Sequence, residues 1–507
     1  MLGRGLSKGC LKMAVNYICG KSSTSSGPMS PVFNPATGKI ARQVALSTPG
    51  EVEQAIAVAK EAFQSWHKLA PVKRARILNR YQALLEKHAW SLAEIISEEH
   101  GKTLDDARGE VARGIEVVEY ACGIPELLKG EHSREVGPGI DSWSQFHPLG
   151  VVAGITPFNF PAMVPMWMYP MAIACGNTFV LKPSEKDPSA SLMLAELATE
   201  AGLPDGVLNV VNGGVDAVNT LLTHPDVEAI SFVGSTRVAE KIYATGTAHG
   251  KRVQALGGAK NHAIVMSDAD LEVTANALMG AAFGSGGERC MAISVAVCVG
   301  DTLADTLSEM LRDRICSLRI GAGQMSGVEM GPLITEAHRD SVASYVRTGQ
   351  AEGATLIVDG LAWNERTDGF FLGASLFDHV TPEMKIYQEE IFGPVLCIVR
   401  VQTFEEALEL VNTHEYGNGA CIFTNNGAIA RHFTDNVKAG MAGVNVALPV
   451  PVAAHSFGGW KRSLFGDLFA YGPDAVRFYT RRKTISQRWP SQISDSGPDY
   501  AFPSSQS

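Results

Sequence analysis

The sequence predicts an α/β protein with two parallel β-sheets. From Gly150 onward, short apolar runs alternate with helical stretches, which is the pattern of βαβ units. A second alternating series begins near Ala263. With 507 residues the chain is too long for one hydrophobic core, so two or three domains are expected.

Two helices are expected before the first sheet. The segment Thr48-Pro-Gly-Glu51 offers a hydroxyl N-cap, Pro at the first helical position and an acid at the third. Apolar residues between Val52 and Trp66 then fall on one helical face. A similar stripe predicts a second helix from about residue 72 to 100, which Gly101 is placed to end.

The first alternating series supplies the elements of one sheet. Right-handed crossovers between such strands place ligands at the carboxyl ends of the strands. Asp187 is expected to cap a helix that Gly202 ends. The expected strands are 151–155, 178–181, 207–211, 229–232 and 252–256, and the expected helices are 162–174, 188–201, 215–222 and 236–244.

The second series and two extended segments complete the expected fold. Segments 145–148 and 475–485 are β-prone and are expected to form a small accessory sheet. The Ser- and Pro-rich tail from Pro490 is expected to be loosely held. The second series begins with strands 264–266 and 293–299 and helices 271–283 and 303–316.

Composition excludes several classes of protein. The net charge of −10 gives no basic surface for nucleic acid, and the longest apolar stretches are broken by Pro and too short to span a membrane. The nine cysteines form no CxxC pair and no zinc-type spacing, so we expect a reducing compartment and no metal. Residues 1–50 hold six Lys or Arg and no acid. We favour a bacterial cytoplasmic protein, with Met13 as an alternative start, over one carrying a transit segment for the mitochondrial matrix.

Cys290 is the candidate nucleophile. It ends the run Phe283-Gly-Ser-Gly-Gly-Glu-Arg-Cys290, in which small residues let a backbone and a ligand approach closely. The adjacent Arg289 is expected to favour the thiolate, which is the reactive form. A lone Cys can also be a small buried hydrophobe, so the motifs elsewhere in the chain decide between the two interpretations.

Polar side chains follow two strands of the first series. Asn159, after strand 151–155, has an amide that can donate to an oxyanion, although an Asn beside Pro is often a turn residue. Lys182 and Glu185 follow strand 178–181 and can bind the hydroxyls of one ribose, or form a solvated ion pair.

Two further motifs offer a phosphate site and an acid. Gly234-Ser235 opens a helix after a strand, and a helix N-terminus favours phosphate, although the motif is not a GxGxxG. Glu390 lies beside Phe392 and a Gly-Pro turn; two adjacent acids are also common on plain surfaces.

Taken in order, these motifs resemble the aldehyde dehydrogenase superfamily, from Phe33-Asn-Pro-Ala-Thr37 to Phe457-Gly-Gly-Trp-Lys461. The resemblance implies a Rossmann-type NAD-binding domain, an α/β catalytic domain and a small β oligomerisation flap, in a homo-oligomer built as a dimer of dimers. The implied ranges are 1–128 and 147–258 (NAD-binding), 259–458 (catalytic), 129–146 and 473–490 (oligomerisation strands) and 491–507 (loose tail).

The resemblance also implies roles for single residues. Cys290 would attack an aldehyde, and Asn159 with the Cys290 backbone N–H would form the oxyanion hole. Lys182 and Glu185 would hold the adenosine ribose, and Glu390 the nicotinamide ribose. The implied cofactor-binding residues are Thr156, Phe158, Lys182, Glu185, Gly234, Ser235, Glu390 and Phe392.

One departure from the superfamily indicates the acyl acceptor. Hydrolytic members carry a Glu in a Glu-Leu-Gly-Gly-Lys segment as base for water, whereas this chain reads Val253-Gln-Ala-Leu-Gly-Gly-Ala-Lys260, with Ala255 or Leu256 in its place. Water, with a pKa near ~15.7, needs a base or metal. A thiol with a pKa of roughly 8.5 already supplies some thiolate near neutrality. The expected acceptor is therefore a thiol, with coenzyme A as the candidate.

The segments around Cys290 and Ala259-Lys-Asn-His262 resemble the CoA-acylating branch that oxidises methylmalonate semialdehyde. In that branch two arginines hold the substrate carboxylate; Arg289 matches one, Arg113 is the best match for the other, and Phe457 is a further candidate. The implied reaction uses NAD and CoA, releases CO₂, and gives propionyl-CoA, or acetyl-CoA from malonate semialdehyde. The alternatives are a hydrolytic enzyme for another small aldehyde, a slow or inactive paralogue, a non-catalytic nucleotide-binding protein and, for Arg113, a surface charge.

Overall fold

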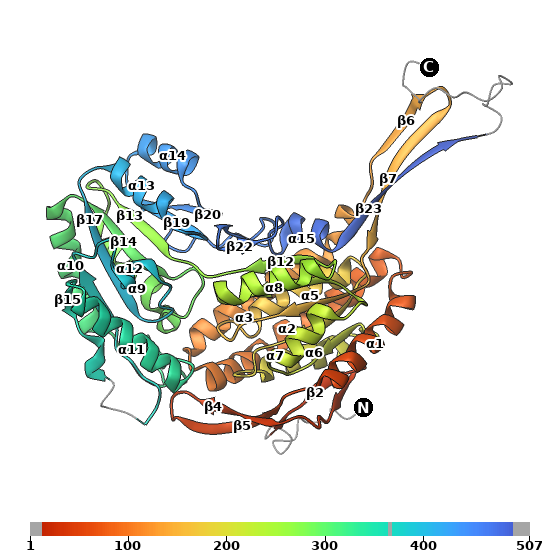
Figure 1. Cartoon of the computed structure of the whole chain (residues 1–507), viewed down its shortest axis with the longest axis horizontal. Helices are drawn as coiled ribbons and strands as arrows, with labels where there is room; N and C mark the ends of the chain where they lie inside the picture. The colour runs from red at the N-terminus through yellow and green to blue at the C-terminus, as the bar shows by residue number, and fades with distance from the viewer. Residues whose placement is uncertain (1–12, 364–367, 490–507) are drawn as a thin grey trace.

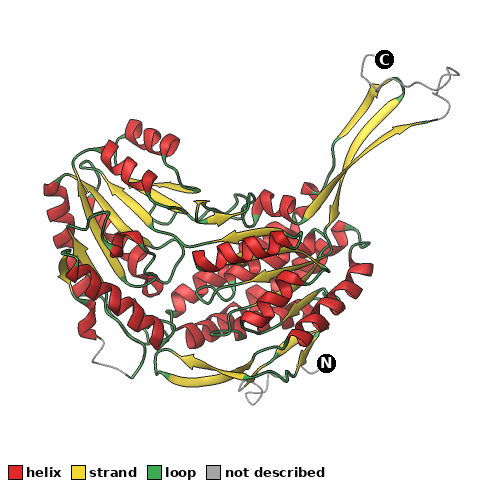
Figure 2. Ribbon diagram, in the orientation of Figure 1, coloured by secondary structure: helices red, strands yellow, loops and turns green. Residues whose placement is uncertain are grey.

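Two sheets with their covering helices make up most of the molecule, and a third, small sheet projects from it (Figure 1). The computed structural model describes residues 13–363 and 368–489. The predicted α/β class is confirmed (Figure 2). Within the described residues, no helix has the length and apolar character needed to cross a membrane. The predicted tail at 491–507 lies outside the described residues.

The first sheet has the strand order β22–β12–β11–β8–β9–β10–β2–β3. The strands from β12 to β10 are parallel, and the outer strands join them antiparallel. All residues of β8 and β9 are buried, because the crossover helices cover both faces. The bounds are β2 Asn16–Ile18, β3 Lys21–Ser23, β8 Val151–Ile155, β9 Thr178–Lys182, β10 Leu208–Val210, β11 Val227–Val233, β12 Arg252–Leu256 and β22 Leu464–Phe465.

Helices cover this sheet in two groups. Side chains alternate along β8, so that Val151 and Ala153 pack with α1, α7 and α8, whereas Val152 packs with α2, α3, α5 and α6. The two helices predicted before the sheet are α1 and α2, and Gly101 ends α2 with a φ of 93°. The bounds are α1 Pro49–Trp66, α2 Pro71–His100, α3 Leu104–Cys122, α4 Ile124–Leu127, α5 Met163–Ala174, α6 Ser189–Glu200, α7 Val215–Thr223 and α8 Thr236–Ala248.

The predicted cap of α6 is wrong. The helix begins at Ser189 after Pro188, and Asp187 is buried without capping it. Glu99, at the end of α2, takes that role: its carboxylate accepts from the Ser189 N–H at 3.1 Å and from the Ser189 hydroxyl at 2.7 Å. A cap from a distant helix is invisible to local sequence patterns.

The second sheet has the order β15–β16–β17–β14–β13–β19–β20 and is parallel except for β15. The bounds of its strands are β13 Asn261–Val265, β14 Ile293–Val299, β15 Thr355–Val358, β16 Ser375–Asp378, β17 Val395–Val401, β19 Gly419–Phe423 and β20 Met441–Val444. Its helices are α9 Leu271–Phe283, α10 Asp301–Cys316, α11 Glu336–Ala351, α12 Lys385–Gln388, α13 Phe404–Thr413 and α14 Gly427–Asn436.

The projecting sheet pairs β6 (His132–Gly137), β7 (Ile140–Pro148) and β23 (Thr480–Arg488) antiparallel. The accessory sheet is therefore present, but residues 473–478 are not strand as expected: α15 spans Gly472–Phe478. Pro473 fits the first turn of a helix, and Ala475, Val476 and Phe478 are buried in the core. Two further small sheets are formed by the remaining strands, one in the order β1–β5–β4 and one by β18 and β21. The bounds are β1 Met13–Ala14, β4 Met29–Asn34, β5 Lys39–Ala45, β18 Tyr416–Gly417 and β21 Trp460–Lys461.

Candidate active site

Cys290 lies on a tight loop between α9 and β14. Ser285 and Gly287 in this loop take left-handed backbone conformations, with φ of 55° and 75°. A Cβ on Gly287 would lie 2.3 Å from the Gly393 carbonyl oxygen, so only glycine lets the two loops touch. The loop therefore brings the nucleophile against segment 388–394.

Two amides fix the backbone of Cys290. The Nδ2 atoms of Asn261 and Asn418 each donate to its carbonyl oxygen at 2.9 Å. Asn261 also accepts from the Gly419 N–H at 3.0 Å, which ties β13 to β19. Sequence reasoning missed both amides, because they meet Cys290 only in the folded sheet.

The Cys290 thiol is partly buried, and this burial raises its pKa to about 12. The Glu390 carboxylate raises the pKa further, whereas backbone hydrogen bonds and, least of all, Arg289 lower it. Arg289 thus acts in the expected direction, toward the thiolate, but its effect is the smallest of those that act on the thiol. Its guanidinium pairs with Asp106 at 2.5 Å and donates to the Gly280 carbonyl at 3.3 Å, so its charge is largely neutralised by a neighbour.

The residues predicted to bind the ribose and phosphates lie at the carboxyl ends of β9 and β11. Lys182 Nζ lies 3.3 Å from Glu185 Oε2. Burial raises the pKa of Glu185, but the Lys182 charge and local hydrogen bonds outweigh burial and the pKa is lowered. Ser235 is the exposed N-cap of α8, and a Cβ on the preceding Gly234 would lie 2.5 Å from the Phe232 ring. An exposed helix start after a glycine suits a phosphate.

Two aromatic rings predicted to bind the cofactor meet edge to face. The ring centroids of Phe158 and Phe392 are 5.9 Å apart. Phe392 has a φ of 57°, and His338 Nε2 lies 2.8 Å from its carbonyl oxygen. Thr156 is buried, and its N–H donates to the Lys182 carbonyl at 3.1 Å. The loop after β8 and the segment before β17 thus meet through these two rings.

Glu390 and Cys290 line one narrow cavity of about 20 Å³. Glu390 Oε1 accepts from the Ala259 N–H at 2.9 Å. Burial raises the pKa of Glu390 to about 7, and the Ala259 hydrogen bond and the Lys260 charge oppose this shift. Among the described residues around this cavity, Glu390 is the only acid.

Segment 253–260 has no carboxylate at Ala255 or Leu256, the two positions at which hydrolytic enzymes of the resembled superfamily would carry their Glu. Ala255 and Leu256 are buried on β12. Gln254 is also buried, with Oε1 accepting from the Ser231 hydroxyl at 2.9 Å and Nε2 donating to the Leu468 carbonyl at 2.7 Å. These side chains pack in the sheet or hydrogen-bond to its neighbours, and none of the three can take a proton from water.

Arg113, on α3, lies in a separate small hollow. Its Nη2 donates to the Pro451 carbonyl oxygen at 2.6 Å, and its Nη1 pairs with Glu116. The Tyr471 hydroxyl donates to the same carbonyl at 2.9 Å. Burial raises the pKa of Tyr471. The Arg113 charge lowers this pKa, and the Cys290 charge raises it further. Tyr471 therefore lies within electrostatic reach of the predicted carboxylate anchor and of the nucleophile.

Phe457 packs against the wall of this hollow. Its ring centroid is 4.7 Å from that of Trp167 and 6.3 Å from that of Tyr471. Tyr471 has a φ of 41°, a conformation that L-residues avoid and that is often found at functional sites. Sequence reasoning missed Tyr471, since nothing local marks its backbone.

The two predicted carboxylate-binding arginines both contact α3. Asp106, the partner of Arg289, lies in the first turn, and Arg113 lies seven residues later, about 10 Å along the axis on the same face. Helix α3 thus separates the residues at which the two arginines are attached, Asp106 and Arg113, along one of its faces.

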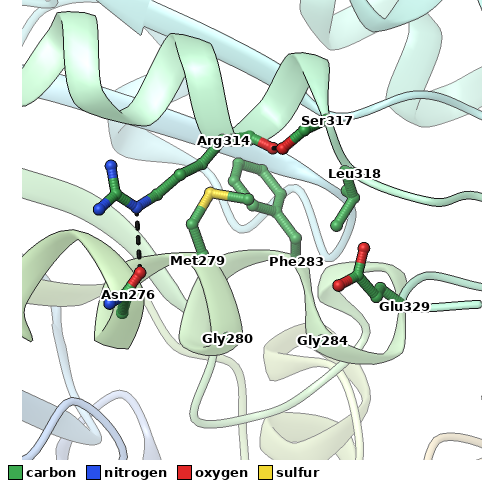
Figure 3. Close-up of a pocket in the computed structure, with 9 residues that line it drawn as sticks. All are labelled: Asn276, Met279, Gly280, Phe283, Gly284, Arg314, Ser317, Leu318 and Glu329. Atoms are coloured by element: carbon green, nitrogen blue, oxygen red, sulfur yellow. Dashed lines mark hydrogen bonds between the residues drawn. The ribbon is translucent and has the colours of Figure 1, made fainter. Parts of the chain in front are cut away.

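A wider hollow of about 290 Å³ lies between α9 and α10 (Figure 3). In its lining, Arg314 Nε donates to Asn276 Oδ1 at 3.0 Å, and the Gly280 carbonyl oxygen accepts from Arg289 Nη1 at 3.3 Å. None of the predicted site residues lines it.

Comparison with known proteins gives the family. The aldehyde dehydrogenase family matches residues 22–485. This chain belongs to the aldehyde dehydrogenase family. It is an oxidoreductase of that family, and the resemblance seen in the sequence is confirmed.

Several relatives cover nearly the whole chain. Malonate-semialdehyde dehydrogenase of Pseudomonas aeruginosa is 62% identical over 491 residues, covering 96% of this chain and 99% of the relative. The crystal structure of methylmalonate-semialdehyde dehydrogenase from Oceanimonas doudoroffii has a TM-score of 0.94 and 60% identity, covering 95% and 99% of the two chains. A putative methylmalonate-semialdehyde dehydrogenase from Sinorhizobium meliloti, complexed with NAD, has a TM-score of 0.93 and 52% identity, covering 94% and 98%.

Proposed function

We propose that this aldehyde dehydrogenase is NAD-dependent and CoA-acylating, and that it converts malonate or methylmalonate semialdehyde to acetyl-CoA or propionyl-CoA with loss of CO₂. The relatives named for these two semialdehydes support the substrate class. The observation that carries the proposal is the segment 253–260, which offers no carboxylate to activate water. Arg113, half-buried near Tyr471, supports a substrate with its own carboxylate.

The residues at the strand ends fit NAD. Lys182 and the ionised Glu185 would hold the adenosine ribose, and the start of α8 at Ser235 would face the pyrophosphate. Phe392 and Glu390 would lie at the nicotinamide end. NAD⁺, when bound, accepts a hydride.

The chain's own residues would perform the remaining chemistry. After its proton has passed to water, the Cys290 thiolate would attack the aldehyde carbon. The new C–S bond would move the carbonyl π electrons onto the oxygen, and this oxyanion would be held by Asn159 Nδ2 and the Cys290 N–H. Loss of hydride would leave a thioester on Cys290. The substrate carboxylate is β to this carbonyl, so the C–C bond to it can break and release CO₂. The electron pair of that bond passes into an enolate, which a solvent proton then converts to the acyl group. The CoA thiolate would take the acyl group and release Cys290.

A rapid-mixing assay of NADH formation with and without CoA tests the proposal. Without CoA we expect a burst of about one NADH per active subunit followed by slow release, because segment 253–260 supplies no carboxylate to activate water for thioester hydrolysis. With CoA we expect steady turnover, and Cys290→Ala should abolish both phases. Fast release of free acid without CoA would instead favour the hydrolytic alternative.

The oligomeric state belongs to the same proposal. We infer that the projecting β6–β7–β23 sheet joins copies of the chain in a dimer of dimers. Deleting residues 132–147 should lower the number of chains per particle, as measured from the mass of the assembly by sedimentation.

A further inference from the structure

The loop that carries Asn159 is held by a buried ion pair. Lys102 Nζ lies 2.8 Å from Glu110 Oε2, and both side chains are 0% exposed. Lys102 follows α2, and Glu110 lies on α3. The pair therefore joins the layer of helices to the loop after β8.

Both members of the pair bind the backbone of this loop. Lys102 Nζ donates to the Asn159 carbonyl oxygen at 2.6 Å. Glu110 Oε1 accepts from the N–H groups of Ala162 at 2.8 Å and Met163 at 3.1 Å. Hydrogen bonds to charged groups are short and strong, so the loop is fixed at its middle, at Asn159, and where it enters α5.

Stability alone explains this pair poorly. Burial raises the pKa of Glu110, against the lowering effect of the Lys102 charge. The loss of hydration of two buried charges commonly offsets their attraction, so such pairs add little to folding. What they provide is a fixed geometry, and here the fixed group is Asn159.

We propose that Lys102 and Glu110 are positioning residues that hold Asn159 for the oxyanion. This rests on the proposed function, in which the Asn159 amide donates to that oxyanion. A donor of this kind works only when it is held in place before the reaction, and misplacement by about 1 Å can cost about 100-fold in rate. Both residues act through Asn159 and are not expected to touch substrate.

The test is a double-mutant cycle on the rate of the first NADH burst with methylmalonate semialdehyde. We expect Asn159→Ala to slow the burst about 100- to 1000-fold, as for loss of one oxyanion donor. Lys102→Met should slow it about 30- to 100-fold. In the Asn159→Ala background, Lys102→Met should cost less than about 3-fold, because the group it positions is already gone.

Two further variants test whether a loss of folding, rather than misplacement of Asn159, explains a slow burst. Lys102→Met/Glu110→Gln removes both charges and keeps an oxygen for the Ala162 N–H, and it should still show the slow burst. Lys251 is the matched control: it is buried, and its Nζ donates to the carbonyls of His224 at 2.5 Å and Val227 at 2.7 Å. Lys251→Met should leave the burst rate unchanged.

The outcomes distinguish a failure of the oxyanion role of Asn159 from a failure of the positioning role of Lys102 and Glu110. If Asn159→Ala keeps the wild-type burst, its proposed role falls and the positioning role falls with it. If Asn159→Ala is slow but Lys102→Met costs the same factor in both backgrounds, only the positioning role is overturned. A wild-type burst in the paired variant would overturn it as well.

Discussion

Replacing Arg113 by Leu should penalise carboxylated aldehydes selectively. A hydrogen bond to a charged group contributes about 1.5–3 kcal/mol. The Arg113 side chain is 30% exposed and already pairs with Glu116, so screening favours the lower part of that range. About 1.5–2 kcal/mol corresponds to a loss of roughly 10- to 30-fold in kcat/KM for methylmalonate semialdehyde.

The assay compares kcat/KM for methylmalonate semialdehyde with that for propanal, which has no carboxylate. Arg113→Leu also loses the bond to the Pro451 carbonyl, and propanal reports any general damage from that loss. Arg108 provides the matched control, because it lies on the same helix, is 58% exposed and pairs with Asp105. An unchanged ratio of the two substrates in Arg113→Leu would show that Arg113 is a surface charge.

Three further outcomes are expected. Because Glu185 stays ionised, it would repel a 2′-phosphate, so kcat/KM should be higher with NAD⁺ than with NADP⁺, and equal values would remove its assignment to the ribose. Because burial raises the pKa of Glu390 to about 7, its carboxylate forms as pH rises through that value, so the KM for NAD⁺ should fall between about pH 6 and 8. Glu390→Gln should flatten that profile, and a persistent slope would assign the titration to another group. Gly287→Ala should lower the free energy of unfolding by more than the ~1–2 kcal/mol of a left-handed residue, since its Cβ would meet the Gly393 carbonyl. Gly250→Ala has a similar φ of 73° with nothing within 4 Å, and a cost equal to that of Gly287→Ala in denaturant unfolding would contradict the close approach.

Local patterns predicted the elements of the fold closely. Helix 271–283 and strand 293–299 were predicted with the bounds that the structure has, because each shows its own periodicity and stop signals. The errors arise where distant residues intervene. Glu99 from α2 replaced Asp187 as the cap of α6, and burial of Phe478 in the core made 473–478 helical.

The sequence by itself determined the fold class, the candidate nucleophile Cys290 and the absence of a carboxylate in segment 253–260, because residue identity and short spacing suffice for each. Tertiary structure alone decided the surroundings of the thiol. Arg289 is next to Cys290 in the chain, yet its charge is directed at Asp106, and burial then controls the pKa. Only folding brings Asn418 to the Cys290 carbonyl and Lys102 to the Asn159 carbonyl. Electrostatic effects and hydrogen bonds depend on distance in space, which sequence separation does not report.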